Sequence, residues 1–350
     1  MISIRCLHRR IAGSAVVLLA ASLPLSGDAH HSGSIFDRNT VVALQGEISR
    51  FSWTNPHVYI YVETATPGGD VVEWQIETDA TPILTRSGWT AESLKPGDQV
   101  VLRANPEHDP ERLHGRLVSV TTADGAMMTA RSSFATRPSE SESGPVATSL
   151  EGVWSTPLAT NQHLWALRAS TRELTPAAIA RQAQYDITTD SPAGKCVPYP
   201  TPTFLGVPYL NEISIEEDRI RIDGELFYSE RVIYTDGRGH PENGELTNQG
   251  HSIGRWEDDV LVVETVQLEE HISAMIDGAP LGERRRIEER FSLSEDGRRL
   301  LIDFTVEDPD YLVTPFSGTM EWDYAPHLEL IGIDCDPEVS ARPWGELGSN

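Results

Sequence analysis

Short stretches in which apolar and polar residues alternate recur along most of the chain, with turn-forming residues between them. Alternation with a period of two is typical of β-strands that bury one face. In the first third of the chain this pattern predicts strands at 41–48, 57–64, 71–78, 99–103 and 116–121. In the second half it predicts strands at 211–215, 219–222, 225–234, 252–256, 260–266, 284–293, 299–306 and 318–324. The sequence is therefore expected to fold as an all-β protein.

Two short helices are expected beside these strands. One covers 80–87, and the other covers 174–185, where Thr175 and Pro176 form a typical helix start. Five strands with one small helix suit a small closed barrel of the oligonucleotide/oligosaccharide-binding (OB) type. The eight or nine antiparallel strands of the second half suit an up-and-down barrel or a sandwich. A barrel of eight strands can just hold one small ligand.

The limits of these patterns divide the chain into four parts. Residues 1–29 are interpreted as an export signal, because Arg5, Arg9 and Arg10 precede an apolar run and Gly27-Asp28-Ala29 offers a cleavage site. A membrane anchor is the alternative, but serines and a proline interrupt the run, which is shorter than a membrane span requires. The remaining parts are an OB-like domain at 30–124, a flexible linker rich in Ser, Thr and Pro at 125–149, and a second β-domain at 150–350.

Charge and cysteine content narrow the partners and the compartment. The chain has 53 acidic and 28 basic residues and a formal net charge of −25, which repels nucleic acid and anionic membranes. Neither is expected as a partner, and no segment after the signal is apolar enough to span a membrane. Cys6 would leave with the signal, so Cys196 and Cys335 remain as a pair and are expected to form a disulfide in an oxidising compartment. The expected location is the periplasm or the extracellular medium.

Several short motifs mark the OB-like part. They are Ala29-His-His-Ser, Gly46-Glu-Ile, Trp53-Thr-Asn-Pro-His, Ser93-Leu-Lys-Pro-Gly-Asp and Leu117-Val-Ser-Val-Thr. With these motifs, residues 29–125 resemble a family of short exported bacterial proteins of unknown function. The resemblance implies export and an OB-like fold, and it implies no activity.

The second β-domain has motifs of its own. They include Lys195-Cys-Val-Pro, Arg231-x-Ile-Tyr-Thr-Asp-Gly-Arg-x-His-Pro and Gly250-His-Ser-Ile-Gly-Arg-Trp-Glu-x-Asp-x-Leu-Val-Val-Glu-Thr. With them, residues 194–335 resemble a second family of uncharacterised exported bacterial proteins, which implies a calycin-like or lipocalin-like barrel. The chain departs from that family's pattern at Asn248-Gln249, at Phe316 and in 267–283, which lacks a second His-Pro-His cluster. A role of that cluster is therefore not carried over to this chain.

The turns of the second β-domain carry the best candidates for chemistry. His240 and His251, with Asp236, are candidate acid–base groups, because an imidazole titrates near neutral pH and a carboxylate can orient it. An arginine can hold a carboxylate or an oxyanion through its planar fork. The candidate ligand-binding residues are Arg231, Tyr234, Arg238, Arg255 and Glu289. The alternative is that the turn is only structural and that both histidines bond to buried backbone groups.

A second candidate site lies at the N-terminus that signal cleavage would create. His30 would then combine a free amine with its own imidazole, and with His31 and His57 it would suit copper by ligand type. The alternative is a frayed terminus without a role. A further charged stretch, 283–290, mixes arginines with glutamates and is interpreted as a solvated strand face with cross-strand ion pairs.

Three functions are compatible with these features. The first is binding of a small, partly apolar molecule in the C-terminal barrel. The second is an acid–base enzyme, a lyase, isomerase or hydrolase, that uses His240 or His251 in the same pocket. The third is periplasmic copper binding at His30; no other cofactor is expected, and the sequence does not indicate an oligomeric state.

Overall fold

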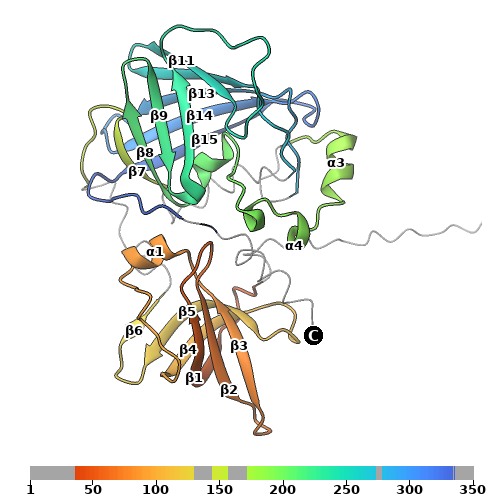
Figure 1. Ribbon diagram of the computed structural model, residues 1–350, viewed down its shortest axis with the longest axis vertical. Helices are drawn as coiled ribbons and strands as arrows, with labels where there is room; N and C mark the ends of the chain where they lie inside the picture. The colour runs from red at the N-terminus through yellow and green to blue at the C-terminus, as the bar shows by residue number, and fades with distance from the viewer. Residues whose placement is uncertain (1–35, 130–143, 157–171, 273–277, 334, 336–350) are drawn as a thin grey trace, which may run out of the picture.

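The computed structural model describes residues 36–129, 144–156, 172–272, 278–333 and 335. Its strands form two barrels, one from each half of the chain (Figure 1). The predicted all-β fold, with few and short helices, is confirmed.

The N-terminal barrel consists of strands β1 to β5 and carries one helix, α1. The bounds are β1 Val42–Ser52, β2 Tyr59–Ala65, β3 Val71–Glu77, α1 Thr81–Arg86, β4 Gln99–Pro106 and β5 His114–Thr122, with a short β6 at Met127–Met128. β1 pairs with β2 and with β4, both antiparallel. The barrel closes where β3 meets β5 in parallel. Its core contains the fully buried side chains of Ile60, Leu102 and Val120.

The C-terminal barrel is closed by nine of the described strands, in the order β10-β11-β12-β13-β14-β15-β7-β8-β9. The bounds are β7 Gly152–Ser155, β8 Leu210–Ile215, β9 Arg219–Gly224, β10 Ser229–Tyr234, β11 His251–Glu257, β12 Val260–Val266, β13 Arg286–Leu293, β14 Arg299–Glu307 and β15 Phe316–Tyr324. The short helices are α3 Pro176–Gln182, α4 Ile187–Asp190, η3 Ala193–Lys195, η4 Thr203–Gly206 and η5 Leu226–Tyr228. Apart from β7 and β10, each predicted strand of this barrel matches these bounds to within two residues.

The structure differs from the predicted strands at β10. The prediction began this strand at 225, but η5 intervenes, and Phe227 and Tyr228 have left-handed backbone angles (φ 54° and 50°) that no strand adopts. β10 also runs parallel to β11 rather than antiparallel. The long connection 235–250 makes this possible, because a parallel pair needs a crossover of a dozen or more residues.

Two joints of this barrel are narrow. β10 and β11 share the pairs Ile233↔Ser252 and Tyr234↔Ile253. β15 and β7 also share two pairs, Asp323↔Ser155 and Tyr324↔Trp154. By contrast, β13 and β14 are paired along the whole of β13.

Bulky side chains fill the inside of the C-terminal barrel. Trp154, Phe291 and Trp322 have no exposed surface, and Trp322 donates its Nε1–H to the carbonyl of Leu205 at 2.8 Å. Further inward side chains that are 5% exposed or less are Ile213, Ile222, Ile233, Val263, Ile287, Ile302, Phe304, Phe316 and Met320. The centre of this barrel is therefore a packed core.

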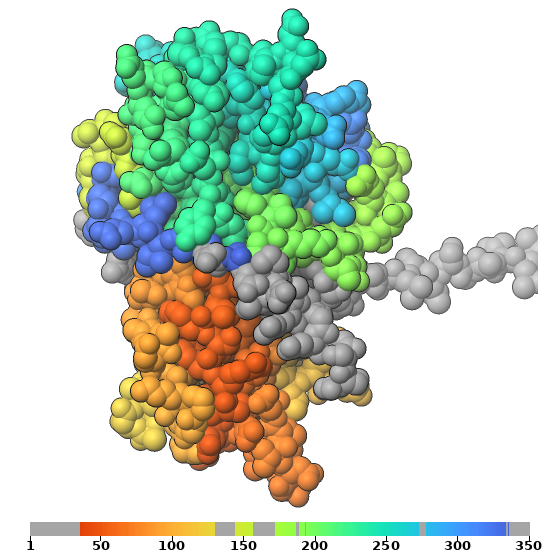
Figure 2. All heavy atoms as spheres, in the orientation of Figure 1, coloured from red at the N-terminus to blue at the C-terminus, as the bar shows by residue number. Residues whose placement is uncertain are grey.

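The two barrels are in direct contact (Figure 2). Arg86 of α1 forms an ion pair with Glu225, which is 1% exposed and lies just before η5. The Glu225 carboxylate also accepts hydrogen bonds from the backbone N–H groups of Leu210 (3.2 Å) and Ile331 (2.8 Å). Ala80, at the start of α1, packs into the hydrophobic core of the C-terminal barrel. One buried carboxylate thus joins three separate parts of the chain.

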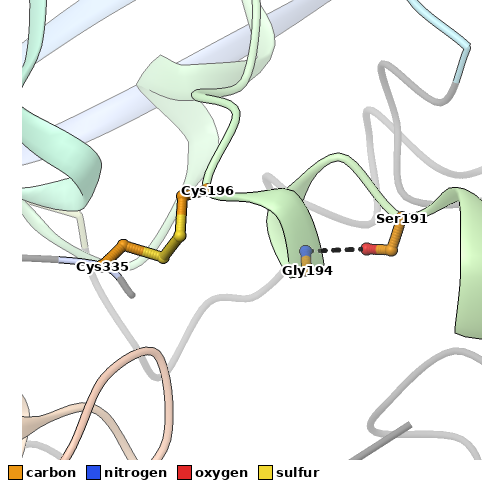
Figure 3. Close-up of a disulfide and its surroundings, with 4 residues drawn as sticks. All are labelled: Ser191, Gly194, Cys196 and Cys335. Atoms are coloured by element: carbon orange, nitrogen blue, oxygen red, sulfur yellow. Dashed lines mark hydrogen bonds between the residues drawn. A yellow bond between two sulfur atoms is a disulfide. The ribbon is translucent and has the colours of Figure 1, made fainter. Parts of the chain in front are cut away.

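The predicted disulfide between Cys196 and Cys335 is present, with the Cα atoms 5.7 Å apart (Figure 3). It ties the segment before β8 to the segment after β15. The predicted linker lies partly outside the described residues, and its last part packs on the barrel, because Ala147 is buried and donates to the carbonyl of Gly297 at 2.8 Å. None of the helices in the described part of the chain is long and apolar enough to cross a membrane.

Candidate functional site

The connection between β10 and β11 brings His240 and His251 together. Their Nδ1 atoms lie 2.8 Å apart, and the rings meet edge to face with centroids 5.0 Å apart. One imidazole must donate and the other accept, so at any moment the pair holds a proton between the two rings. On its other side, His240 Nε2 lies 3.2 Å from the carboxylate of Glu264 on β12. The three groups form a chain in the order carboxylate, imidazole, imidazole.

The series of Glu264, His240 and His251 lies on the outer face of the barrel. Side chains alternate between the two faces of a strand, and the neighbours Ser252 and Thr265 are fully buried inside the barrel. His251 and Glu264 therefore point outward, and both are partly exposed. The connection 235–250 crosses over them and supplies His240.

Burial and neighbouring charges set the protonation of Glu264 and His251. Arg286 of β13 pairs with Glu264, and this hydrogen bond, more than the nearby His240, lowers the pKa of Glu264. Partial burial, followed by the charges of His240 and Arg238, lowers the pKa of His251. The resulting arrangement at neutral pH is an ionised Glu264 and a neutral His251. Among the described residues, no hydrogen-bond partner is found for Nε2 of His251.

An aromatic ring and an arginine complete this group. The ring of Tyr234 stacks on His251 with centroids 5.2 Å apart, and the guanidinium of Arg238 lies 3.9 Å from the Tyr234 ring centre. Arg238 is held by Asp236, whose carboxylate accepts from Nε at 2.9 Å and from the backbone N–H of Arg238 at 3.1 Å. These bonds lower the pKa of Asp236 to about 2. Residues Tyr234, Arg238, His240, His251 and Glu264 are called the His240–His251 cluster below.

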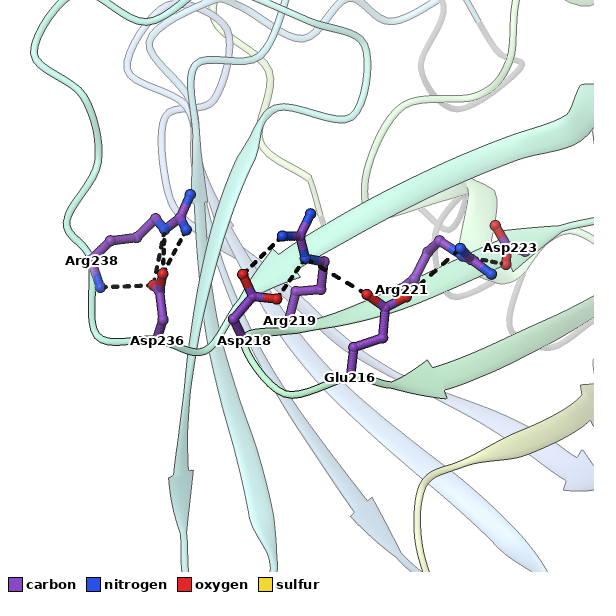
Figure 4. A network of polar contacts seen from close by, with 7 residues as sticks. All are labelled: Glu216, Asp218, Arg219, Arg221, Asp223, Asp236 and Arg238. Atoms are coloured by element: carbon purple, nitrogen blue, oxygen red, sulfur yellow. Dashed lines mark hydrogen bonds and ion pairs between the residues drawn. The ribbon is translucent and has the colours of Figure 1, made fainter.

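Near β9 and the end of β10, arginines and carboxylates form a row of ion pairs, called a ladder below (Figure 4). Asp218 holds Arg219 through two bonds of 2.8 Å, and Asp223 holds Arg221 at 2.8 Å. Asp236 belongs to this ladder and contacts Arg238, not a histidine. Of the three predicted catalytic residues, His240 and His251 are in contact, whereas Asp236 orients Arg238. The carboxylate beside the imidazoles is that of Glu264.

Two predicted ligand-binding residues, Arg231 and Glu289, lie inside the barrel. Arg231 is 1% exposed and Glu289 0%, and Nη1 of Arg231 donates to Glu289 at 2.9 Å while Nη2 also bonds the same carboxylate. Arg231 further donates to Ser252 (Nε, 3.2 Å) and Thr265 (Nη2, 2.9 Å). Every nitrogen of this guanidinium has a partner within the core, which is the arrangement of a structural ion pair.

The last predicted ligand-binding residue, Arg255, is separate from both groups. It bonds to Glu257 at 2.8 Å, and both side chains are largely exposed. Exposed pairs of this kind contribute little to stability.

Of the predicted copper ligands, His30 and His31 lie outside the described residues. His57 follows β1 and has Nδ1 3.2 Å from the carbonyl of Thr78 and 3.7 Å from Glu77. Glu77 is itself bonded to Arg116 at 2.5 Å. In the part of the chain that the structure describes, no three or more His, Cys, Asp or Glu side chains are grouped to hold a metal ion. Copper binding stays a prediction.

Glu264 and Arg286 are the members of the site that sequence reasoning missed. The signal was present in the alternation along β12, where Glu264 stands between the inward Val263 and Thr265. Its partner on β11 is Ile253, which lies two residues from His251 on the same outer face. This neighbour relation depends on strand register, which the sequence did not fix.

Comparison with known proteins covers the N-terminal part. No match is found among curated proteins. A model of a family of unknown function (DUF6152) matches residues 17–116, which span most of the N-terminal barrel and the segment before it.

Proposed function

We propose that this protein is exported and that its C-terminal barrel binds a small, partly apolar molecule with an acidic hydroxyl group at the His240–His251 cluster. The supporting observation is the neutral imidazole of His251, whose Nε2 has no partner among the described residues and can accept a hydrogen bond. The inside of the barrel is occupied by packed side chains, so the outer face is the better place for a ligand. The disulfide between Cys196 and Cys335 supports export, because such bonds persist in oxidising compartments.

The geometry also favours one type of ligand over another. A hydroxyl or phenol donor can face Nε2 of His251, and Arg238, on the Tyr234 ring that stacks on His251, is the nearby cation that could stabilise negative charge on such a group. The ring of Tyr234 beside them offers an apolar and aromatic edge. A cationic ligand would find the carboxylates at this place already paired, Glu264 with Arg286 and Asp236 with Arg238.

Binding of 4-nitrophenol tests this proposal, because its absorbance reports both binding and loss of its proton. His251→Ala removes one hydrogen bond and is expected to weaken binding by roughly two- to tenfold. His327→Ala is the matched control, since His327 is an exposed histidine outside the cluster, and it should bind like the wild type. Equal affinity of wild type and His251→Ala, or a wild type that does not bind, would remove the proposal.

Acid–base catalysis at the same nitrogen is the second candidate. It is favoured by the order Glu264, His240, His251, because a carboxylate that orients an imidazole is the usual way to prepare a general base. The hydrolysis of 4-nitrophenyl acetate tests the hydrolase form of this idea. A positioned base contributes roughly 10²–10⁴-fold, so a fall of about a hundredfold in His251→Ala is expected, with a smaller fall in Glu264→Gln. A rate that is the same in His251→Ala as in the wild type would exclude His251 as a base in this reaction.

A further inference from the structure

The crossover from β10 to β11 is lightly held to the barrel. All of its residues 236–246 are exposed to solvent except His240 and Gly244, which are partly buried. In the described structure, no backbone-to-backbone hydrogen bond joins this stretch to a strand. Such bonds begin only beyond its two ends, where the N–H groups of Thr235 and Thr247 donate to neighbouring segments at 2.9 Å and 3.1 Å. Residues 236–246 are called the strap below.

Two groups hold the middle of the strap through polar contacts. His240 is the first, with Nδ1 2.8 Å from Nδ1 of His251 and Nε2 3.2 Å from the carboxylate of Glu264. The second is the carbonyl of Pro241, which accepts from Nε2 of Gln267 at 2.5 Å. The side chain of His240 is only 17% exposed, whereas Pro241 is exposed. His240 is therefore the deeper of the two anchors.

The two imidazoles face each other head-on. Their centroids are 5.0 Å apart and their Nδ1 atoms 2.8 Å, so both nitrogens lie on the line between the rings. Because Nε2 of His240 faces Glu264, His240 carries its proton there and accepts from Nδ1–H of His251. A first added proton can go to Nε2 of His251 and leave this bond intact. A second must go to Nδ1 of His240, and two N–H groups that face each other cannot bond.

Burial and nearby arginines disfavour a doubly charged pair of rings. The charged and titratable groups that face the rings or their partners are Arg219 of β9, Tyr234 of β10, Asp236 and Arg238 of the strap, Glu264 of β12, Arg286 and Glu288 of β13, and Glu307 of β14. The carboxylates of Glu264 and Asp236 are already paired with arginines.

The contact between the rings therefore depends on pH. Burial, followed by the charges of His240 and Arg238, lowers the pKa of His251, so the contact favours a neutral ring. The stabilisation that the contact gives is fully present above the ordinary histidine pKa of about 6.5. It is lost as the pH falls from there through the lowered value.

We propose that acid releases the strap: once both imidazoles are protonated, their bond breaks and the strap moves away from the outer face of the barrel. Gly237 and Gly239 allow this movement, since each has open space where a side chain would stand. Each proton taken up on release raises the ratio of released to attached strap about tenfold per pH unit. The release concerns the same cluster as the proposed function but does not rest on it, so failure of 4-nitrophenol to bind leaves it standing.

NMR of the full-length protein between about pH 7.5 and pH 5 tests the release. The ¹H–¹⁵N NOE of the Gly244 and Leu246 amides reports fast motion of the strap, and the ¹⁵N shifts of the imidazoles report which nitrogens carry protons. The NOE is expected to be high at the upper pH and to fall as the second ring is protonated, while the amide of Val263 in the buried core stays rigid. A strap NOE that is low throughout, or that stays high when both rings are protonated, overturns the proposal.

Three variants complete the test. His251→Ala removes the partner of His240 and should free the strap already at the upper pH, with no further change on acidification. His327→Ala, at an exposed histidine outside the cluster, should keep the response of the wild type. Glu242→Gln with Glu245→Gln removes the two exposed glutamates of the strap and should also keep it. A rigid strap in His251→Ala, or a release that is absent from either control, overturns the proposal.

Discussion

Replacing Arg231 with methionine is expected to lower the free energy of unfolding by about 3–5 kcal/mol, the usual loss when one partner of a buried ion pair is removed. Glu289 is 0% exposed, so the carboxylate that remains has no access to water and loses both bonds to the guanidinium. Ser252 and Thr265 are less affected, because their hydroxyl oxygens lie 2.8 Å apart and bond to each other. Since a domain of this kind has about 5–15 kcal/mol in total, the loss is a large fraction of its stability.

The double variant Arg231→Met with Glu289→Leu is the control that separates charge from packing. It removes both charges and leaves apolar side chains of similar size, so it should be within about 2 kcal/mol of the wild type or more stable. Unfolding in urea, followed by tryptophan fluorescence, gives the three free energies, and Trp154 and Trp322 report on this core. A single variant that loses less than about 1 kcal/mol, or a double variant less stable than the single one, would show that the pair is not a structural ion pair. A ligand role for Arg231 would then regain support.

Three further perturbations have expected outcomes. Burial, and then the charge of Arg285, lowers the pKa of His271 to about 4, below the unfolded value of about 6.5. The free energy of unfolding should therefore fall as the pH falls from about 6.5 to 4, by about 2 kcal/mol between pH 7 and 5. Urea unfolding of His271→Asn should lack that part of the pH dependence. Arg86→Ala leaves Glu225 buried without its cation and should lower the free energy of unfolding by about 3 kcal/mol, with Arg86→Lys recovering part of it in the same assay. Serine at both Cys196 and Cys335 opens a loop of 139 residues and should lower the unfolding free energy by about 2–5 kcal/mol, an effect that reduction of the wild type must reproduce.

Much of the fold could be predicted because apolar and polar residues alternate so regularly. The strand Val260–Val266 was predicted with the bounds that it has, and the disulfide followed from the two remaining cysteines. β7 was not predicted as a strand, because Gly152–Ser155 is too short to show a period. The parallel pairing of β10 with β11 was also missed, since local pattern carries no information on the direction of a strand's partner.

The site was predicted in part. The motifs placed His240 and His251 in the turn region between two predicted strands. The structure brings their rings into contact. The side of the barrel on which they meet could not be predicted, because a register change of one residue moves a side chain to the other face. The same difficulty affected 283–290, which was interpreted as a solvated face. Arg285 and Glu289 are in fact buried there. Each lies two residues from the apolar Ile287, which places all three on the inward face.

The two narrow joints of the C-terminal barrel divide it into half-barrels, one of β7 to β10 and the other of β11 to β15. Arg231 belongs to the first half and Glu289 to the second, so their contact fastens the halves across the middle. When the protein is heated, the halves are expected to separate along the joints before either one loses its internal pairing. The amide protons that bond across the β10–β11 joint would then exchange with solvent sooner than those that bond β13 to β14. Replacing Arg231 would widen that difference.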